Sequence, residues 1–201
     1  MIASMLKLSS SDCKALKLED AYSVHRVVYS LFPKRSKEEP RDFLFADKGG
    51  DFTGRQILIF SQRKPLEPEH GKIETKEIPE SFLACAHYGF EVTLNPVTRN
   101  GPSQTTTPIK GAENLTNWFI KKTPIWGFSV EPESLQVCRM GVVNFDKNKD
   151  GKTFEQTHNT ATFIGKLTVT DRQSFIKSFK EGIGKARGFG FGLLQIVPIQ
   201  K

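Results

Sequence analysis

Residues 161–199 read ATFIGKLTVTDRQSFIKSFKEGIGKARGFGFGLLQIVPI, and this stretch decides the fold. Its opening residues, 161–169, predict a strand, and Asp171 is expected to cap the helix that follows. The apolar residues of that helix recur at helical spacing and form one face: Phe175, Ile176, Phe179 and Ile183. Gly182 and the glycines after it end the helix, and residues 193–199 predict a final strand. A strand, a helix and a strand in this order are half of a domain in which helices cover one face of an antiparallel sheet.

The preceding part of the second half supplies the other elements of such a domain. Strands are predicted at residues 88–94 and 136–145, with a helix at 112–122 between them. The polar segment 146–159 leads from there to residues 161–169 and is expected to form a long hairpin arm. The order strand, helix, two strands, helix, strand is that of a ferredoxin-like βαββαβ domain.

The first half follows the same order more loosely. A helix is predicted at residues 18–32, where Pro33 stops it, and strands are predicted at residues 1–8, 43–45 and 56–60. The serine-rich residues 9–12 predict a turn. Residues 64–79, with three prolines and many charges, predict no regular structure.

These two series of elements predict the fold class of the whole chain of 201 residues. We expect an α+β protein with two tandem ferredoxin-like (RRM-like) βαββαβ domains. The division is expected at residues 1–85 and 86–201.

The charge of the chain favours an anionic partner. There are 29 Lys and Arg against 22 Asp and Glu, which gives a net charge of +7. Residues 139–201 contain 11 basic and 5 acidic residues, whereas residues 1–138 contain 18 and 17. A positive surface is therefore expected on the second domain.

Cysteine and histidine usage points away from metal sites and disulfides. The three cysteines are far apart, and a chain with so few fits a reducing compartment, the cytoplasm. His70, His87 and His158 have no carboxylate or cysteine at ligand spacing, so neither a metal nor another cofactor is expected. No apolar run approaches the roughly 18 residues of a membrane span, and the N-terminus does not resemble a secretion signal.

Residues 182–192, GIGKARGFGFG, have the most unusual composition in the chain. Five glycines leave backbone N–H groups accessible, while Lys185 and Arg187 add charge, a combination suited to phosphates. The run lacks the Ser or Thr that follows the lysine of a nucleotide-binding P-loop. The alternative interpretation is a tight connection with two solvated charges.

Tyr22 and His25 lie three residues apart on the predicted helix, which puts both rings on nearly one face. Imidazole exchanges protons near neutral pH, and a neighbouring phenol can donate a hydrogen bond to a phosphate oxygen. The pair suits proton-transfer catalysis. Its alternative role is simple packing, which is the commoner role of such a pair.

Two further groups of basic residues suit a polyanion. Lys34, Arg35 and Arg41 follow the helix that carries His25, and the alternative for them is a solvated loop. The second group, in the predicted hairpin arm, suits a groove of a folded nucleic acid or an exposed tip: Lys147, Lys149 and Lys152. The arm lacks the closing glutamate of a calcium loop, because position 157 is threonine.

Four segments, taken in order, resemble the CRISPR-associated endoribonucleases of the CasE (Cse3) type, which process repeat RNA for the type I-E Cascade complex. They are Tyr22-x-x-His25-Arg26 running into Ser30-Leu31-Phe32-Pro33, Arg41-Asp42-Phe43-Leu44-Phe45, Leu94-Asn95-Pro96, and Gly182 to Leu194. The resemblance covers nearly the whole length except residues 98–132. Two positions depart from it, since Tyr29 stands where these proteins usually have Trp and Phe191 where Cys is common.

The resemblance implies two tandem ferredoxin-like domains and a metal-independent endoribonuclease that cleaves CRISPR repeat RNA at the 3′ side of its stem-loop. It implies that His25 is the general acid/base and Tyr22 its partner. The upstream ribose 2′-OH would attack the adjacent phosphate and leave a 2′,3′-cyclic phosphate and a 5′-OH. The protein would then stay bound to the crRNA hairpin as a subunit of Cascade.

An A-form stem is recognised mainly through its phosphates and backbone shape, so the hairpin is expected across the positive second domain. The expected RNA-binding residues are Arg26, Lys34, Arg35, Arg41, Lys147, Lys149, Lys152, Lys185, Arg187 and Gly188. Two other functions stay open at this point. One is a non-catalytic RNA hairpin-binding module of the same fold, and the other is a metal-dependent nuclease or nucleotide-binding enzyme.

Overall fold

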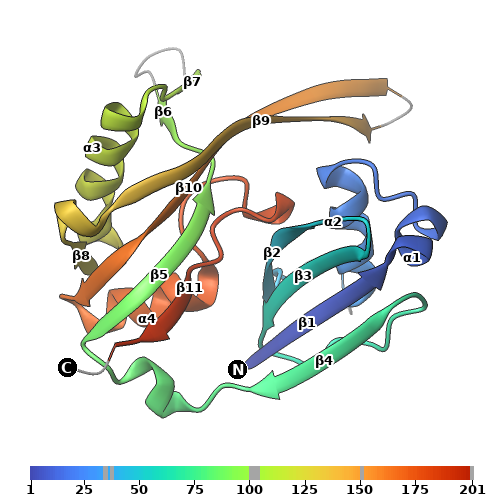
Figure 1. Cartoon of the computed structure of the whole chain (residues 1–201), viewed down its shortest axis with the longest axis horizontal. Coiled ribbons are helices and arrows are strands. Elements are labelled where there is room, and N and C mark those ends of the chain that lie inside the picture. The colour runs from blue at the N-terminus through green and yellow to red at the C-terminus, as the bar shows by residue number, and fades with distance from the viewer. Residues whose placement is uncertain (34–35, 37–38, 100–104, 150–151, 200–201) are drawn as a thin grey trace. The chain divides into compact units, whose positions relative to one another are not determined.

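The computed structural model describes residues 1–33, 36, 39–99, 105–149 and 152–199; of 145–149 and 152–156 it describes the backbone alone. The chain forms two compact units (Figure 1). The first unit consists of Met1–Pro79, Asn144–Gln156 and Gly188–Gly190, and the second of Glu80–Val143, Thr157–Arg187 and the residues from Phe191 onward. The chain first passes between them after Pro79.

The first unit contains a four-stranded antiparallel sheet with strand order β2-β3-β1-β4, the order of a ferredoxin-like domain. Its strands are β1 (Ile2–Ser9), β2 (Phe43–Gly50), β3 (Gly54–Ser61) and β4 (Lys72–Glu77). Two helices, α1 (Ser10–Ala15) and α2 (Ala21–Ser30), connect β1 to β2. The three strands and the longer helix expected in this half are thus confirmed.

Two predictions for the first half are wrong. Residues 72–77 form the edge strand β4, because Ile73 pairs with Leu6 of β1 while most of the remaining β4 side chains are charged and face solvent. Residues 9–12 begin α1 instead of a turn, since the Ser9 hydroxyl accepts a hydrogen bond from the Asp12 N–H at 3.2 Å. Residues 62–71, all described, contain no helix, so this unit lacks the second helix of a complete βαββαβ domain.

Helix α2 buries one face against the sheet and leaves another for chemistry. Val24 and Val28, which are 1% and 0% exposed, belong to the same core as the strand residues Leu6 and Ile59. Asp20 caps the start of the helix, since its Oδ1 accepts a hydrogen bond from the Ser23 N–H at 2.7 Å. Successive helical residues turn by about 100°, so the side chains at the spacing of residues 22, 25 and 29 share a face separate from the valines.

The second unit is a complete βαββαβ arrangement, and its sheet order β11-β5-β10-β8 is again that of a ferredoxin-like domain. The strands of this path are β5 (His87–Leu94), β8 (Phe128–Val130), β10 (Lys152–Val169) and β11 (Gln195–Pro198). Helix α3 (Ala112–Lys122) has the bounds that the sequence predicts, and α4 (Arg172–Glu181) is capped by Asp171 as expected. The tandem ferredoxin-like fold is confirmed.

Strand β9 (Gln136–Lys149) pairs with β10 beside that path and makes the long hairpin that the sequence predicts (Figure 1). In the second unit β6 (Val97–Arg99) and β7 (Thr106–Pro108) form a small hairpin. The described residues also form short 3-10 turns at Glu80–Leu83, Thr123–Trp126, Pro132–Ser134 and Arg187–Phe189. Gly188 and Phe189 of the last turn belong to the first unit.

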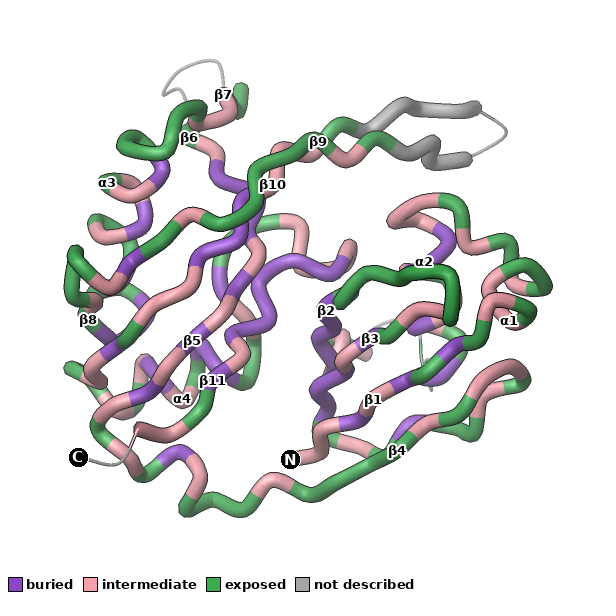
Figure 2. Tube along the Cα trace, viewed as in Figure 1, coloured by how far each residue is buried: buried purple, intermediate pink, exposed green. Residues whose placement is uncertain are grey.

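An aromatic core holds the second unit together. Phe119 of α3 stacks on Phe163 of β10 with ring centroids 4.4 Å apart, and Tyr88 of β5 packs against Phe175 of α4 at 5.4 Å. All four residues are 0% exposed. Figure 2 shows buried stretches in purple along β5. Burial of rings of this size, in offset or tilted pairs, is the main source of stability of such a layer. Trp118 and Trp126 pack against each other, with ring centroids 6.3 Å apart.

Over the described ranges, none of the helices combines the length and the apolar character needed to cross a membrane.

Candidate active site

A row of aromatic rings lies along one face of α2, and the last of them, Tyr29, packs against the core. The His25 ring stacks on Tyr29 with centroids 3.8 Å apart and planes 27° apart, and on Tyr22 at 5.7 Å with planes only 10° apart. The spacings i−3 and i+4 place one tyrosine on each side of the histidine along the helix. Phe189 of the glycine-rich segment is a third neighbour, at 5.3 Å from the His25 ring. The imidazole is therefore held by aromatic faces.

A main-chain hydrogen bond fixes which nitrogen of His25 is protonated. Nδ1 of His25 lies 2.7 Å from the carbonyl oxygen of Gly188, in the first unit. A carbonyl oxygen only accepts hydrogen bonds, so Nδ1 carries the proton and donates it. In the neutral ring the lone pair is then on Nε2, the nitrogen that can accept a proton.

The glycines at 188 and 190 allow this backbone to approach its neighbours. A Cβ added to Gly188 would lie 3.2 Å from Arg41 Nη1 and 3.4 Å from the Tyr29 hydroxyl oxygen. Gly190 has φ +85°, and an added Cβ there would lie 2.9 Å from Phe45 Cε2. The guanidinium of Arg41 is thereby placed beside the residue whose carbonyl binds His25.

The structure thus brings together four residues that the sequence predicts for the site: Tyr22, His25, Arg41 and Gly188. Arg26 is on the same helix and exposed. Lys34 and Arg35 lie outside the described residues. Three others are in the hairpin of β9 and β10, where only the backbone is described: Lys147, Lys149 and Lys152.

The two basic residues of the glycine-rich run belong to the second unit and differ in their surroundings. Lys185 is exposed. Arg187 is half-buried, and its Nη1 donates hydrogen bonds to the carbonyl oxygens of Glu181 and Gly182, at 2.5 and 3.3 Å, at the C-terminal end of α4. A cation at this end of a helix satisfies open carbonyls, so Arg187 has a structural role in addition to the predicted one.

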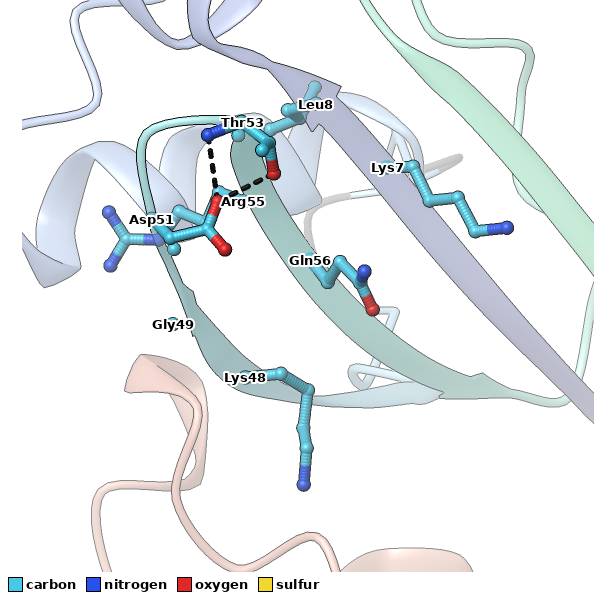
Figure 3. Close-up of a pocket in the computed structure, with 10 residues that line it drawn as sticks. Lys7, Leu8, Lys48, Gly49, Asp51, Thr53, Arg55 and Gln56 are labelled. Atoms are coloured by element: carbon cyan, nitrogen blue, oxygen red, sulfur yellow. Dashed lines mark hydrogen bonds between the residues drawn. The ribbon is translucent and has the colours of Figure 1, made fainter.

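A hollow of about 470 Å³ lies at the β2–β3 turn and the adjoining end of β1 (Figure 3). At its rim the Asp51 carboxylate accepts hydrogen bonds from the Thr53 hydroxyl and N–H, at 2.6 and 2.8 Å, which lowers the pKa of Asp51. Two of its cations already have carboxylate partners: Lys7 pairs with Glu74 at 2.7 Å, and Arg55 pairs with Asp47. This hollow is therefore a weaker candidate for a phosphate site than the surroundings of His25.

His158 is a packed residue of the second unit. The Asn95 side-chain Nδ2 lies 3.0 Å from His158 Nδ1, and because an amide nitrogen only donates, the imidazole accepts there. Burial lowers the pKa of His158. Both observations favour the neutral ring. Among the described residues, no three or more His, Cys, Asp and Glu side chains form a group that could hold a metal ion.

Sequence reasoning missed two of the rings around His25. Tyr29 lies four residues after His25, a helical spacing that was available in the sequence, but it reads equally as part of the apolar pattern. Phe189 gives no local signal, because its approach to α2 depends on tertiary structure.

Comparison with known proteins gives consistent results. The chain is 27% identical to the CRISPR system Cascade subunit CasE of Escherichia coli strain K12, over 90% of this chain and 93% of that protein. A structure of CRISPR endoribonuclease Cse3 bound to a 19-nucleotide RNA superimposes with a TM-score of 0.84 at 18% identity, covering 98% of this chain and all of the other. Thermus thermophilus Cse3 bound to an RNA representing a pre-cleavage complex gives 0.79 at 18% identity, with 98% of each chain covered.

The two structural matches support the fold, and the sequence match extends over almost the whole of both proteins. The family model described as CRISPR associated protein matches residues 2–198. The chain therefore belongs to the family of CRISPR associated proteins.

Proposed function

We propose that this protein is a metal-independent endoribonuclease that cleaves CRISPR repeat RNA at the 3′ side of its stem-loop. The observation that carries the proposal is the placement of His25, whose Nδ1 is engaged by the Gly188 carbonyl and whose Nε2 is the proton-exchanging atom. The names of the relatives agree with it, since one is a Cascade subunit and another an RNA-bound CRISPR endoribonuclease.

The chemistry needs few protein groups, because the nucleophile belongs to the RNA. The 2′-OH upstream of the scissile phosphate attacks phosphorus, the bond from phosphorus to the 5′ oxygen breaks, and the products are a 2′,3′-cyclic phosphate and a 5′-OH. His25 transfers a proton during this exchange, and Tyr22 hydrogen-bonds a phosphate oxygen. Arg41, beside Gly188, stabilises the negative charge that develops on the phosphate.

The remaining basic residues bind the hairpin. In this proposal Lys185 and Arg187 contact phosphates of the stem, with Arg26, Lys34 and Arg35 near the scissile step and the lysines of the β9–β10 hairpin along the stem. A protein that holds its product in this way stays with the crRNA and acts as a subunit of Cascade, in the cytoplasm. Positive charge concentrated in residues 139–201 supports this mode of binding.

The proposed function is tested by incubating the purified chain with a synthetic repeat hairpin in excess EDTA. We expect full cleavage, because no step uses a metal, with a 2′,3′-cyclic phosphate on the upstream product and a 5′-OH on the downstream one. Mass spectrometry of both products reads the two ends. Loss of activity in EDTA that returns with added Mg²⁺ would favour a metal-dependent nuclease, and a 5′-phosphate product would reject the 2′-OH route.

Replacing Lys185 with alanine should weaken hairpin binding and make it less sensitive to salt. One phosphate contact contributes about one unit to the slope of log Kd against log salt, so we expect a slope lower by about 1. Lys185 is better suited to this test than Arg187, because Arg187 also hydrogen-bonds the C-terminal end of α4. Lys121, exposed at the end of α3, provides the matched control, K121A. A slope equal to that of the parent would place Lys185 in solvent.

A further inference from the structure

Tyr29 lies closer to the His25 ring than Tyr22 or Phe189 does. The two centroids are 3.8 Å apart, against 5.7 Å for Tyr22 and 5.3 Å for Phe189. Tyr29 is itself fixed, since its ring meets the edge of Phe43 at 4.9 Å and an interplanar angle of 80°. Its hydroxyl oxygen also lies beside Gly188, the residue whose carbonyl accepts the His25 proton. Tyr29 therefore touches both the imidazole and the surroundings of its hydrogen bond.

The electrostatic consequence follows from the stacked geometry. An aromatic face carries partial negative charge and attracts a cation above it, so the Tyr29 ring favours imidazolium over neutral imidazole. The Gly188 carbonyl acts in the same direction, because a hydrogen bond to a carbonyl strengthens when the donor is charged. The Arg41 guanidinium, which reaches Gly188 from the segment before β2, acts in the opposite direction. Tyr22 and Phe189 also present rings to His25.

We infer that Tyr29 is a positioning residue that keeps the His25 imidazole in place and favours its protonated form, so that His25 gives its proton to the leaving 5′ oxygen. The inference rests on the proposed function. In this step the 2′ oxygen bonds to phosphorus and loses its proton to water, and the bond from phosphorus to the 5′ oxygen breaks. That oxygen takes the proton of Nε2, and solvent later returns a proton to the ring. No oxidant, metal or co-reactant is needed.

The first arm of the test compares Y29L, which removes the ring, with Y29F, which keeps it. We expect Y29L to cleave the repeat hairpin about tenfold more slowly at neutral pH, with Kd unchanged within about twofold, a size within the range of general acid catalysis. The alkaline limb of its pH–rate profile should move to lower pH by about half a unit, since less imidazolium is present at a given pH. Y29F should stay close to the parent in both respects. An unmoved limb would mean that Tyr29 only fills space.

The second arm uses a hairpin in which sulfur replaces the bridging 5′ oxygen at the scissile phosphate. A thiolate leaves without being protonated, so the defect of Y29L should disappear and both proteins should cleave this RNA at equal rates. A defect as large with sulfur as with oxygen would overturn the inference. If Y29L does not fold by circular dichroism, F189L tests the same argument, with a smaller expected loss. If the unsubstituted protein did not cleave the hairpin with the normal 5′ oxygen, this result would contradict the proposed function and not the role of Tyr29.

Discussion

Replacing His25 with alanine will slow cleavage of a repeat hairpin by about a thousandfold, within the range attributed to a single general acid or base. The affinity for the hairpin will change by less than about twofold, because the expected phosphate contacts come from other side chains. Single-turnover cleavage and a filter-binding assay measure the two quantities separately. This combination distinguishes a catalyst from a non-catalytic RNA-binding module of the same fold, for which no substitution changes a cleavage rate.

The matched control for His25 is His70, a histidine of the same unit whose ring lies 3.8 Å from the Asp12 carboxylate. H70A should cleave at the parental rate, since His70 has no part in the proposed chemistry. If H25A cleaved as fast as H70A, His25 would have no role in the mechanism. The Tyr22 and His25 pair would then have only its alternative role, packing.

Substituting deoxyribose for the single ribose upstream of the scissile phosphate will abolish cleavage at that bond. The reaction has no alternative nucleophile in this mechanism, because the 2′-OH itself attacks the phosphorus, and positioning accounts for most of its acceleration. The hairpin should still bind, since the phosphates are unchanged. Denaturing gel electrophoresis after prolonged incubation gives the measurement.

A hairpin with the deoxyribose one nucleotide further downstream controls for local changes in RNA shape and should be cut normally. If the RNA with the upstream substitution were still cut at the same bond, an activated water would have to be the nucleophile. The whole proposal for His25 and Tyr22 would then need another chemistry.

Much of the fold was predictable because its signals are local. Helix α3 has the predicted bounds, since an apolar face between breakers is visible within eleven residues. Strand β4 was not predictable, because its charged sequence becomes a strand only through pairing with β1, from Ile2–Glu77 to Lys7–Lys72. Helix α1 was missed for a different reason, since a serine-rich stretch predicts a turn and a helix cap equally.

The candidate site likewise has features that the sequence predicted and features that it did not. The spacing of Tyr22 and His25 on one helix predicted that their rings would share a face. The partner of His25 Nδ1 lies 163 residues further along the chain, in a segment that sequence reasoning assigned to binding phosphates. Arg187 was expected to contact phosphates or to lie in solvent, and the structure adds hydrogen bonds to the end of α4 that no local pattern indicates. Tertiary contacts of this kind follow from packing and not from periodicity.

The hydrogen bond from His25 to Gly188 has a consequence for how this protein tolerates mutation. The acceptor is a main-chain carbonyl, which every amino acid carries, so no codon change at position 188 can delete it. A substitution there is limited by the size of the new side chain, because Arg41 and Tyr29 lie nearby, and by the backbone conformation that it must adopt. The path of the main chain therefore determines the tautomer of His25. This tautomer is kept after substitutions that would remove a side-chain hydrogen-bond partner.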